Sequence, residues 1–112
     1  MNSILYTIKK LIGLEPDYNA FDESIIAFIN GAFATLQQMG IGPASPFRIQ
    51  NGEKTWDDWS GDAFIVEETK SYVYLHVRKL FDPSSSSIVM DALENQIAEI
   101  GWRLYTYSQS EY

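Results

Sequence analysis

Hydrophobic residues recur every three or four positions in four stretches of the chain, and this is the period of an amphipathic helix. The predicted helices begin near Ile4, Asp22, Asp62 and the serines at 84–87. Each has one apolar stripe, which becomes stable only when it packs against another element. The pattern predicts a mainly α, single-domain antiparallel bundle of about four helices, with a long loop or short β-hairpin inserted at about 41–62.

Capping signals and charges support the first helix. Ser3 is its predicted N-cap, because a serine oxygen can accept a free backbone N–H of the first turn. Gly13 is its predicted stop. Lys9 and Lys10 fall on the side away from the apolar stripe, so both are predicted to face solvent.

The second helix is bounded in a similar way. Asp22 is its predicted N-cap, and its charge also suits the positive end of the helix dipole. Gly40 and Gly42 are predicted to end the helix, and Pro43 forbids its continuation.

The segment at 41–62 differs in composition from the predicted helices, since it holds two prolines, three glycines and two tryptophans. Residues 47–49 suit a short strand and Asn51-Gly52 suits a tight turn, so a hairpin and an irregular loop both remain open. A loop this long in so small a domain is more often functional than accidental.

Within this segment, Trp56 and Trp59 flank Asp57 and Asp58. Two tryptophans in a polar loop either close over the bundle or anchor a partner, because tryptophan is enriched at binding hot spots. Both alternatives stay open. The acids, with Asp62, lack the ligand spacing of a calcium loop, so solvated loop acids and a helix cap are the favoured interpretation.

Residues 71–77 are rich in β-branched and aromatic side chains and would also suit a strand. The flanking residues 66–70 and 78–82 favour a helix, with Ser60 or Asp62 as its N-cap.

Four consecutive serines at 84–87 could be a linker between two units or the beginning of a helix. An apolar stripe that runs from Val89 to Leu104 begins two residues later. Asp82 and Pro83 just upstream match an N-cap and a first helical position. The serines are therefore predicted to form a tight corner and first turn between two antiparallel helices of one domain.

Composition narrows the possible functions. A chain of 112 residues, 46% of them hydrophobic, suits one domain with a real core. Eight Lys and Arg against 15 Asp and Glu give a net charge of −7, which argues against a domain that coats phosphates but does not exclude one past which DNA slides. With no cysteine, disulfides and thiolate sites are excluded. No signal peptide or membrane span is predicted, so a soluble, intracellular chain is expected.

The sequence offers little reaction chemistry. His76 is the only histidine, and no carboxylates are spaced to share a metal with it, so a structural role is the favoured interpretation. Neither a serine-nucleophile motif nor a dinucleotide-binding loop is present. We expect no enzyme, no cofactor and no metal.

The order of the segments resembles the head–tail connector proteins of tailed bacteriophages and prophages, also labelled adaptor, head-completion or phage DNA-packaging proteins. The resemblance covers residues 4–104. It is carried by "FDESII..IN.AF..L.Q.G.GP" at Phe21–Pro43, "YVYL.VR..FDP" at Tyr72–Pro83 and "E.Q..E..WR" at Glu94–Arg103. These are packing and turn positions, and none is a catalytic motif.

The resemblance implies a structural virion-assembly protein. Such proteins form a ring, typically of twelve subunits, between the portal and the tail, where they extend the DNA channel and complete the head after DNA packaging. The implied partners are further copies of the chain, the portal, and a tail-completion or stopper protein. DNA would pass without specific binding, and no membrane is involved. The implied location is the head–tail junction of the virion, and the host cytoplasm during assembly.

The segment at 41–62 and a C-terminal tail at 105–112, expected to be loose beyond Tyr107, are the best candidates for subunit contacts. Trp102 lies off the main stripe and either widens the buried face or meets a neighbouring subunit. Arg103 is expected to pair with acids by default. The candidate protein-interface residues are Trp56, Asp57, Asp58, Trp59, Arg48, Arg103, Tyr105, Tyr107 and Tyr112. The alternative function is a small intracellular binding module or regulator that uses the aromatic 41–62 loop.

Overall fold

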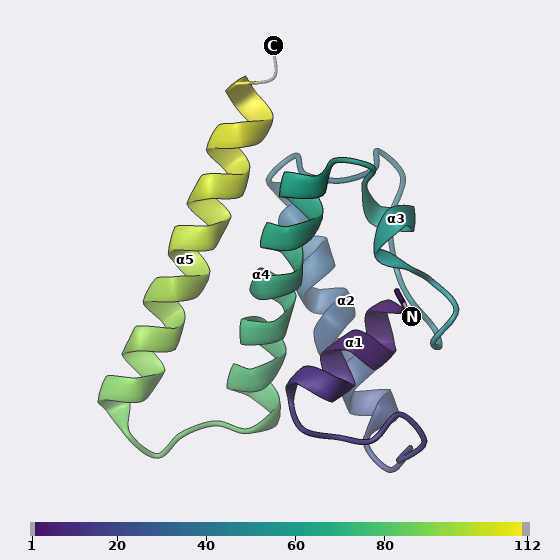
Figure 1. Ribbon diagram of the computed structural model, residues 1–112. Helices are drawn as coiled ribbons and strands as arrows, with labels where there is room; N and C mark the ends of the chain where they lie inside the picture. The colour runs from purple at the N-terminus through teal and green to yellow at the C-terminus, as the bar shows by residue number, and fades with distance from the viewer. Residues whose placement is uncertain (1, 111–112) are drawn as a thin grey trace.

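The computed structural model describes residues 2–110, and this part of the chain contains five helices. They are α1 (Ile4–Leu11), α2 (Asp22–Gln38), α3 (Trp56–Trp59), α4 (Ala63–Phe81) and α5 (Ser87–Ser110). Figure 1 shows α2, α4 and α5 running alternately up, down and up, as expected for antiparallel neighbours. The mainly α class is confirmed, and α3 is a helix that the hydrophobic pattern did not predict.

The predicted stripes of the first two helices form the centre of the core. Ser3 caps α1 as predicted, because its Oγ accepts the Tyr6 N–H at 3.3 Å. Apolar side chains from α1, α2 and α4 then pack together where these helices meet. Among the buried residues are Ile4, Ile8, Ile25, Ile29, Phe33, Leu36, Val73 and Val77.

Lys9 and Asp22 join α1 to the start of α2. The prediction that Lys9 faces solvent was wrong, because its side chain is fully buried. Its Nζ lies 2.9 Å from Asp22 Oδ1 and donates to the Pro16 carbonyl oxygen at 2.9 Å. A buried ammonium needs such partners. Asp22 therefore pairs with Lys9 instead of capping α2, and Phe21, at the N-cap position, makes no side-chain capping bond.

The segment at 41–62 folds as an irregular loop followed by the single turn of α3, and no hairpin forms within it. Two side-chain amides of α2 satisfy its backbone in place of a partner strand. Asn30 accepts the Ile49 N–H at 2.8 Å and donates to the Ile49 carbonyl at 3.0 Å. Gln37 accepts the N–H of Phe47 at 3.0 Å and donates to the carbonyls of Pro43 and Ser45. We call these two residues the amide clamps.

The loop also meets the start of the chain. Ser3 and Thr55 form an isolated antiparallel bridge, in which the Ile4 N–H donates to the Lys54 carbonyl at 3.0 Å. Thr55 and Asp58 then form a capping box for α3, because the Thr55 N–H donates to Asp58 Oδ2 at 2.8 Å. The end of the loop is thus fixed by α1 and by its own helix turn.

Gly42 stands at a position that only glycine fits. Its φ is +90°, a backbone conformation that L side chains rarely adopt. A Cβ atom there would also overlap the indole ring of Trp59. Gly42 therefore does more than stop α2, because it lets the chain pass directly over a buried tryptophan.

The residues 71–77 belong to a helix and not to a strand, as their flanks predicted. Asp62 is the N-cap of α4, and its Oδ1 accepts the N–H groups of Phe64 at 2.9 Å and Ile65 at 3.2 Å. Helix α4 packs against α2 on one side and α5 on the other, so it is the element that both share.

The serine run makes a corner between α4 and α5, as predicted, but the helix begins later than Asp82 and Pro83 suggested. Asp82 is the C-cap of α4. Ser86 supplies the N-terminal hydrogen bond of α5, since its Oγ accepts the Val89 N–H at 3.3 Å. The helix itself starts at Ser87.

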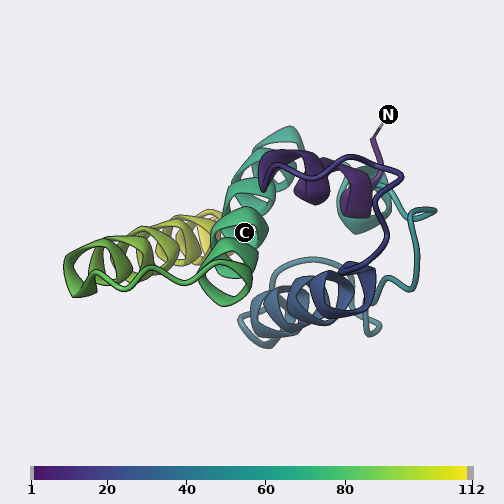
Figure 2. The ribbon, with the colours of Figure 1, turned by 90° about the horizontal axis from the view of Figure 1, so that it is seen from below.

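Helices α1, α2 and α4 form the centre of the core, and α5 adds its buried side chains to the same hydrophobic cluster from one side. Helix α5 packs chiefly against α4, and in Figures 1 and 2 it extends along the outer edge of the molecule. It buries Leu93, Ile100 and Leu104 and leaves most of its remaining surface exposed. The tail at 105–112 was predicted to be loose beyond Tyr107. Its described residues, up to Ser110, instead continue helix α5.

Candidate interaction surfaces

The two tryptophans of α3 are core residues. Trp56 and Trp59 are almost completely buried, and each indole N–H has a partner. Trp56 Nε1 donates to Thr7 Oγ1 at 3.2 Å, and Trp59 Nε1 donates to Thr69 Oγ1 at 3.0 Å. Trp59 also packs against Phe33 with ring centroids 4.6 Å apart. Of the two alternatives for these residues, the structure shows closure over the helices.

The acids between them are exposed. Asp58 is occupied by the capping box of Thr55, and Asp57 lies on the open side of the same turn. Within residues 2–110, no group of three or more histidine, aspartate or glutamate side chains is placed to hold a metal ion. The Asp57–Asp58 pair is therefore a solvated feature at the start of a short helix.

Tyr107 ties the C-terminal part of α5 to the beginning of α4. Its hydroxyl donates to Asp62 Oδ2 at 2.8 Å, and its ring lies 4.4 Å from that of Phe64. The hydrogen bond from Tyr107, with further bonds from the Ile65 and Phe64 N–H groups, lowers the pKa of the Asp62 carboxyl. Tyr107 thus has an internal role, and Tyr112 lies outside the described residues.

Arg103 is held by acids, as the default interpretation predicted. Its guanidinium lies 2.9 Å from Glu68 Oε1 on α4 and 3.7 Å from Glu99 Oε1 one turn back on α5. These partly exposed pairs orient Arg103 along the α4–α5 seam, but such pairs contribute little to stability.

An apolar groove runs beside α5 on the flank away from Arg103. It has a volume of about 290 Å³, and its lining includes residues from the end of α2, from α4 and from α5. Trp102 and Tyr105 form its outer wall, with 64% and 41% of their surfaces exposed and their rings stacked 6.3 Å apart. We call it the α5 groove. Met39, Tyr72, Ala98 and Gly101 also line this groove.

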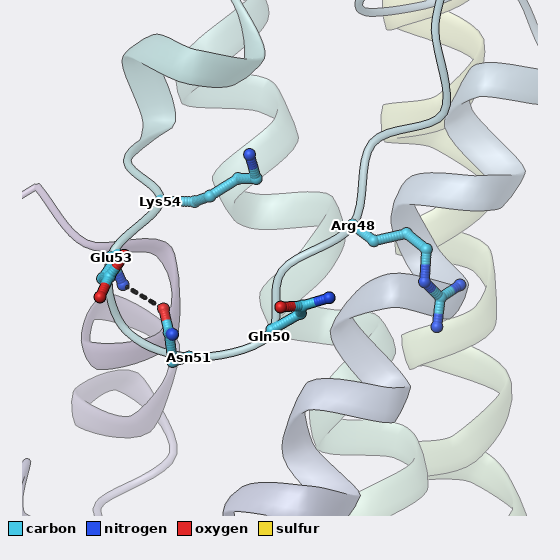
Figure 3. Close-up of a pocket in the computed structure, with 5 residues that line it drawn as sticks. All are labelled: Arg48, Gln50, Asn51, Glu53 and Lys54. Carbon is cyan, nitrogen blue, oxygen red and sulfur yellow. Dashed lines mark hydrogen bonds between the residues drawn. The ribbon is translucent and has the colours of Figure 1, made fainter.

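A second hollow lies in the loop before α3 and is polar. Arg48, Gln50, Asn51, Glu53 and Lys54 line a volume of about 320 Å³, which we call the Arg48 pocket (Figure 3). Asn51 Oδ1 accepts the Glu53 N–H at 2.9 Å and so fixes the tip of the loop. Arg48 and Lys54 are exposed, and neither forms an ion pair within residues 2–110.

His76 lies partly buried on α4, where its ring faces Gly31 of α2. Burial, and then the nearby Lys79 ammonium, lower the pKa of the His76 imidazole. Because both effects favour the neutral form, His76 acts as a packing residue at the α2–α4 contact.

The residue patterns found only part of these surfaces. Tyr105 and Arg48 were predicted as interface candidates and are exposed, and Trp102 was predicted to be either buried or available to a neighbour. Met39, Tyr72 and Gly101 were missed, because they come together only when the end of α2, α4 and α5 pack against one another. A usable signal was present in the spacing of Ala98, Trp102 and Tyr105, which forms a second stripe beside the buried one.

Residues 2–110 thus form a mainly helical protein whose surface carries an apolar groove beside α5 and a cationic pocket in the loop before α3. The family model for the phage connector protein matches residues 4–111, and the chain belongs to this family. This membership gives the protein a structural role in the phage head–tail connection and makes it a component of the virion. No curated protein and no solved structure matches the chain. Within residues 2–110, no helix has the length and apolar character needed to span a membrane.

Proposed function

We propose that the protein assembles as a ring between the phage portal and the tail, where it extends the DNA channel and completes the head after packaging. The observation that carries this proposal is the family match over residues 4–111, which takes in all the helices described between residues 2 and 110. The ring would sit at the head–tail junction and carry the docking surface for a tail-completion or stopper protein.

The charge of the chain supports the channel role. A net charge of −7 per subunit is multiplied in a ring, and an acidic lumen repels the phosphates of DNA. DNA would then pass without being held. The alternative function, a peptide- or protein-binding module, would use the tryptophans of the 41–62 loop to contact its partner. Because Trp56 and Trp59 are buried, they favour this alternative less.

The proposal is tested by negative-stain microscopy of the protein mixed with the purified portal of the same phage. We expect a ring-shaped density that caps the portal and is absent from the portal alone. The protein by itself is a poor test, because a ring that forms only on the portal would be missed. If the mixture shows bare portals at protein concentrations well above those of the portal, the proposal is wrong.

A further inference from the structure

One side of α5 combines apolar and acidic residues. Counting back from Trp102 in steps of three or four residues reaches Ala98, Asn95 and then Asp91, so all four lie on the same face of the helix. Together with Tyr105, they form what we call the outer stripe of α5. Asp91 gives the outer stripe a charge of −1, because the other charged residues of α5, which are Glu94, Glu99 and Arg103, lie outside the stripe and form ion pairs within residues 2–110.

The Arg48 pocket has the complementary charge. Residues 41–55 contain Arg48 and Lys54 against one acid, Glu53, which gives a charge of +1. Arginine is the cation best suited to this kind of surface, because its guanidinium stacks on aromatic rings as well as pairing with carboxylates. The outer stripe offers both kinds of partner, in Trp102 and Asp91.

The two surfaces lie at opposite edges of the molecule. Figures 1 and 2 show α5 at one side and the tip of the loop before α3 at the other, in two perpendicular views. A subunit with complementary surfaces on opposite edges joins its neighbours head to tail, and such contacts close into a ring when the rotation from one subunit to the next closes on itself. Contact between two outer stripes would instead place two surfaces of the same negative charge against each other.

We propose that the outer stripe of α5 in one copy of the chain docks against the Arg48 pocket of the next copy. Trp102 and Tyr105 would be covered by the neighbour's loop, with Arg48 stacked on Trp102 or paired with Asp91. This inference rests on the proposed ring, and it identifies the two surfaces that join its subunits.

The test uses the absence of cysteine from the chain. Ala98→Cys lies in the outer stripe and Gln50→Cys in the Arg48 pocket, so any disulfide between two copies of the chain joins introduced thiols. Each single variant is assembled on the portal separately, and the two are also assembled there as a mixture. Each sample is then oxidised, and the products are separated by denaturing gel electrophoresis without reductant. We expect a covalent dimer only in the mixture, and a ladder of higher oligomers from the chain that carries both substitutions.

Charge reversal gives an independent check. Arg48→Glu should lower the cross-linking yield by about tenfold, the effect of roughly 1.4 kcal/mol in an association constant, and Asp91→Arg in the partner variant should restore it. Arg78→Glu is the matched control, because Arg78 is an exposed arginine of α4 outside both surfaces, and it should leave the yield unchanged.

The outcomes separate this contact from the ring itself. Rings on the portal by microscopy without cross-linking between Ala98→Cys and Gln50→Cys would overturn the contact and leave the proposed function standing. Dimers from Ala98→Cys alone would show α5 facing α5 and would also overturn it. Cross-linked ladders that never cap a portal would support the contact and reject the proposed function.

Discussion

The loop before α3 and helix α5 show opposite relations between regular structure and burial. The loop at 41–55 has almost no regular structure, yet it places Ile41, Phe47 and Ile49 in the core, and its backbone is hydrogen-bonded to the side chains of Asn30 and Gln37 on α2. Helix α5 is regular from Ser87 to Ser110, yet it packs chiefly on α4 and exposes most of its surface. Regular structure therefore does not identify which part of this chain is most firmly held.

The difference follows from how the backbone N–H and C=O groups of each segment find hydrogen-bond partners. Helix α5 makes its own hydrogen bonds, so it needs only one apolar stripe against a neighbour. The loop cannot do so, and its buried N–H and C=O groups require partners elsewhere. Asn30 and Gln37 supply them, and this joins the loop to the core more tightly than α5 is joined.

The sharpest test of this contrast replaces Trp59 of α3, whose ring packs against that of Phe47 in the loop with centroids 5.2 Å apart, and Trp102 of α5. Trp59→Ala should lower the free energy of unfolding by about 3–5 kcal/mol, because it empties a large buried site. Trp102→Ala should change it by no more than about 0.5 kcal/mol, because Trp102 is 64% exposed. Urea denaturation measures both. Equal losses for the two variants would contradict the contrast.

The next largest effect is expected at Gly42. Gly42→Ala should cost about 2–4 kcal/mol, from the positive φ and from the clash with the Trp59 ring. Gly40→Ala is the matched control, since its φ is +88° but a Cβ there meets nothing within 4 Å, so only about 1–2 kcal/mol is expected. Urea titration of both variants measures the difference. Adding Trp59→Ala to Gly42→Ala should give less than the sum of the two losses.

The amide clamps are tested at Asn30. Asn30→Ala leaves the buried N–H and C=O of Ile49 without their partner and should cost about 2 kcal/mol. The control is Asn95→Ala on the exposed face of α5, which should be neutral or slightly stabilising because alanine is the better helix former. Thermal and urea unfolding report both changes. A neutral Asn30→Ala would show that the loop does not depend on its clamp.

The smallest effect concerns the contact that holds the end of α5. Because the pKa of Asp62 is lowered from its ordinary value of 3.8, its stabilisation is complete above that value and is lost as the pH falls through the lowered pKa. Tyr107→Phe removes the main cause of the lowering, so this variant should lose less stability between about pH 5 and pH 2. Urea midpoints across this range measure the change. Tyr105→Phe, on the exposed wall of the groove, should behave like the parent, and an unchanged acid response in Tyr107→Phe would contradict the assignment.

The sequence predicted the long helices well, because their signals are local. Ser3 as the cap of α1, Asp62 as the cap of α4 and the serine corner all depend on residues close together in the chain. The errors arose where a distant residue competed for the same side chain. Asp22 was predicted to cap α2, but Lys9 pairs with it instead.

The interaction surfaces were harder to predict for the same reason. Tryptophans in a polar loop suit a core or an interface equally well. Both can be buried here because Thr7 and Thr69, which are distant in the sequence, accept hydrogen bonds from their indole N–H groups. The α5 groove exists only where Tyr72 of α4 meets Gly101 of α5, which no local pattern reports. Arg48 was predictable as an exposed cation, but its place opposite α5 depended on the whole fold.

The amide clamps also bear on how such a protein changes during evolution. Asn30 and Gln37 bind only main-chain atoms of the loop, so they hold it whatever side chains it carries. Exposed positions between or next to the clamped residues, Arg48 and Gln50 among them, are then free to mutate without loss of the loop's shape. Selection can thus adapt this edge of the molecule to a new neighbour while the fold that presents it stays the same.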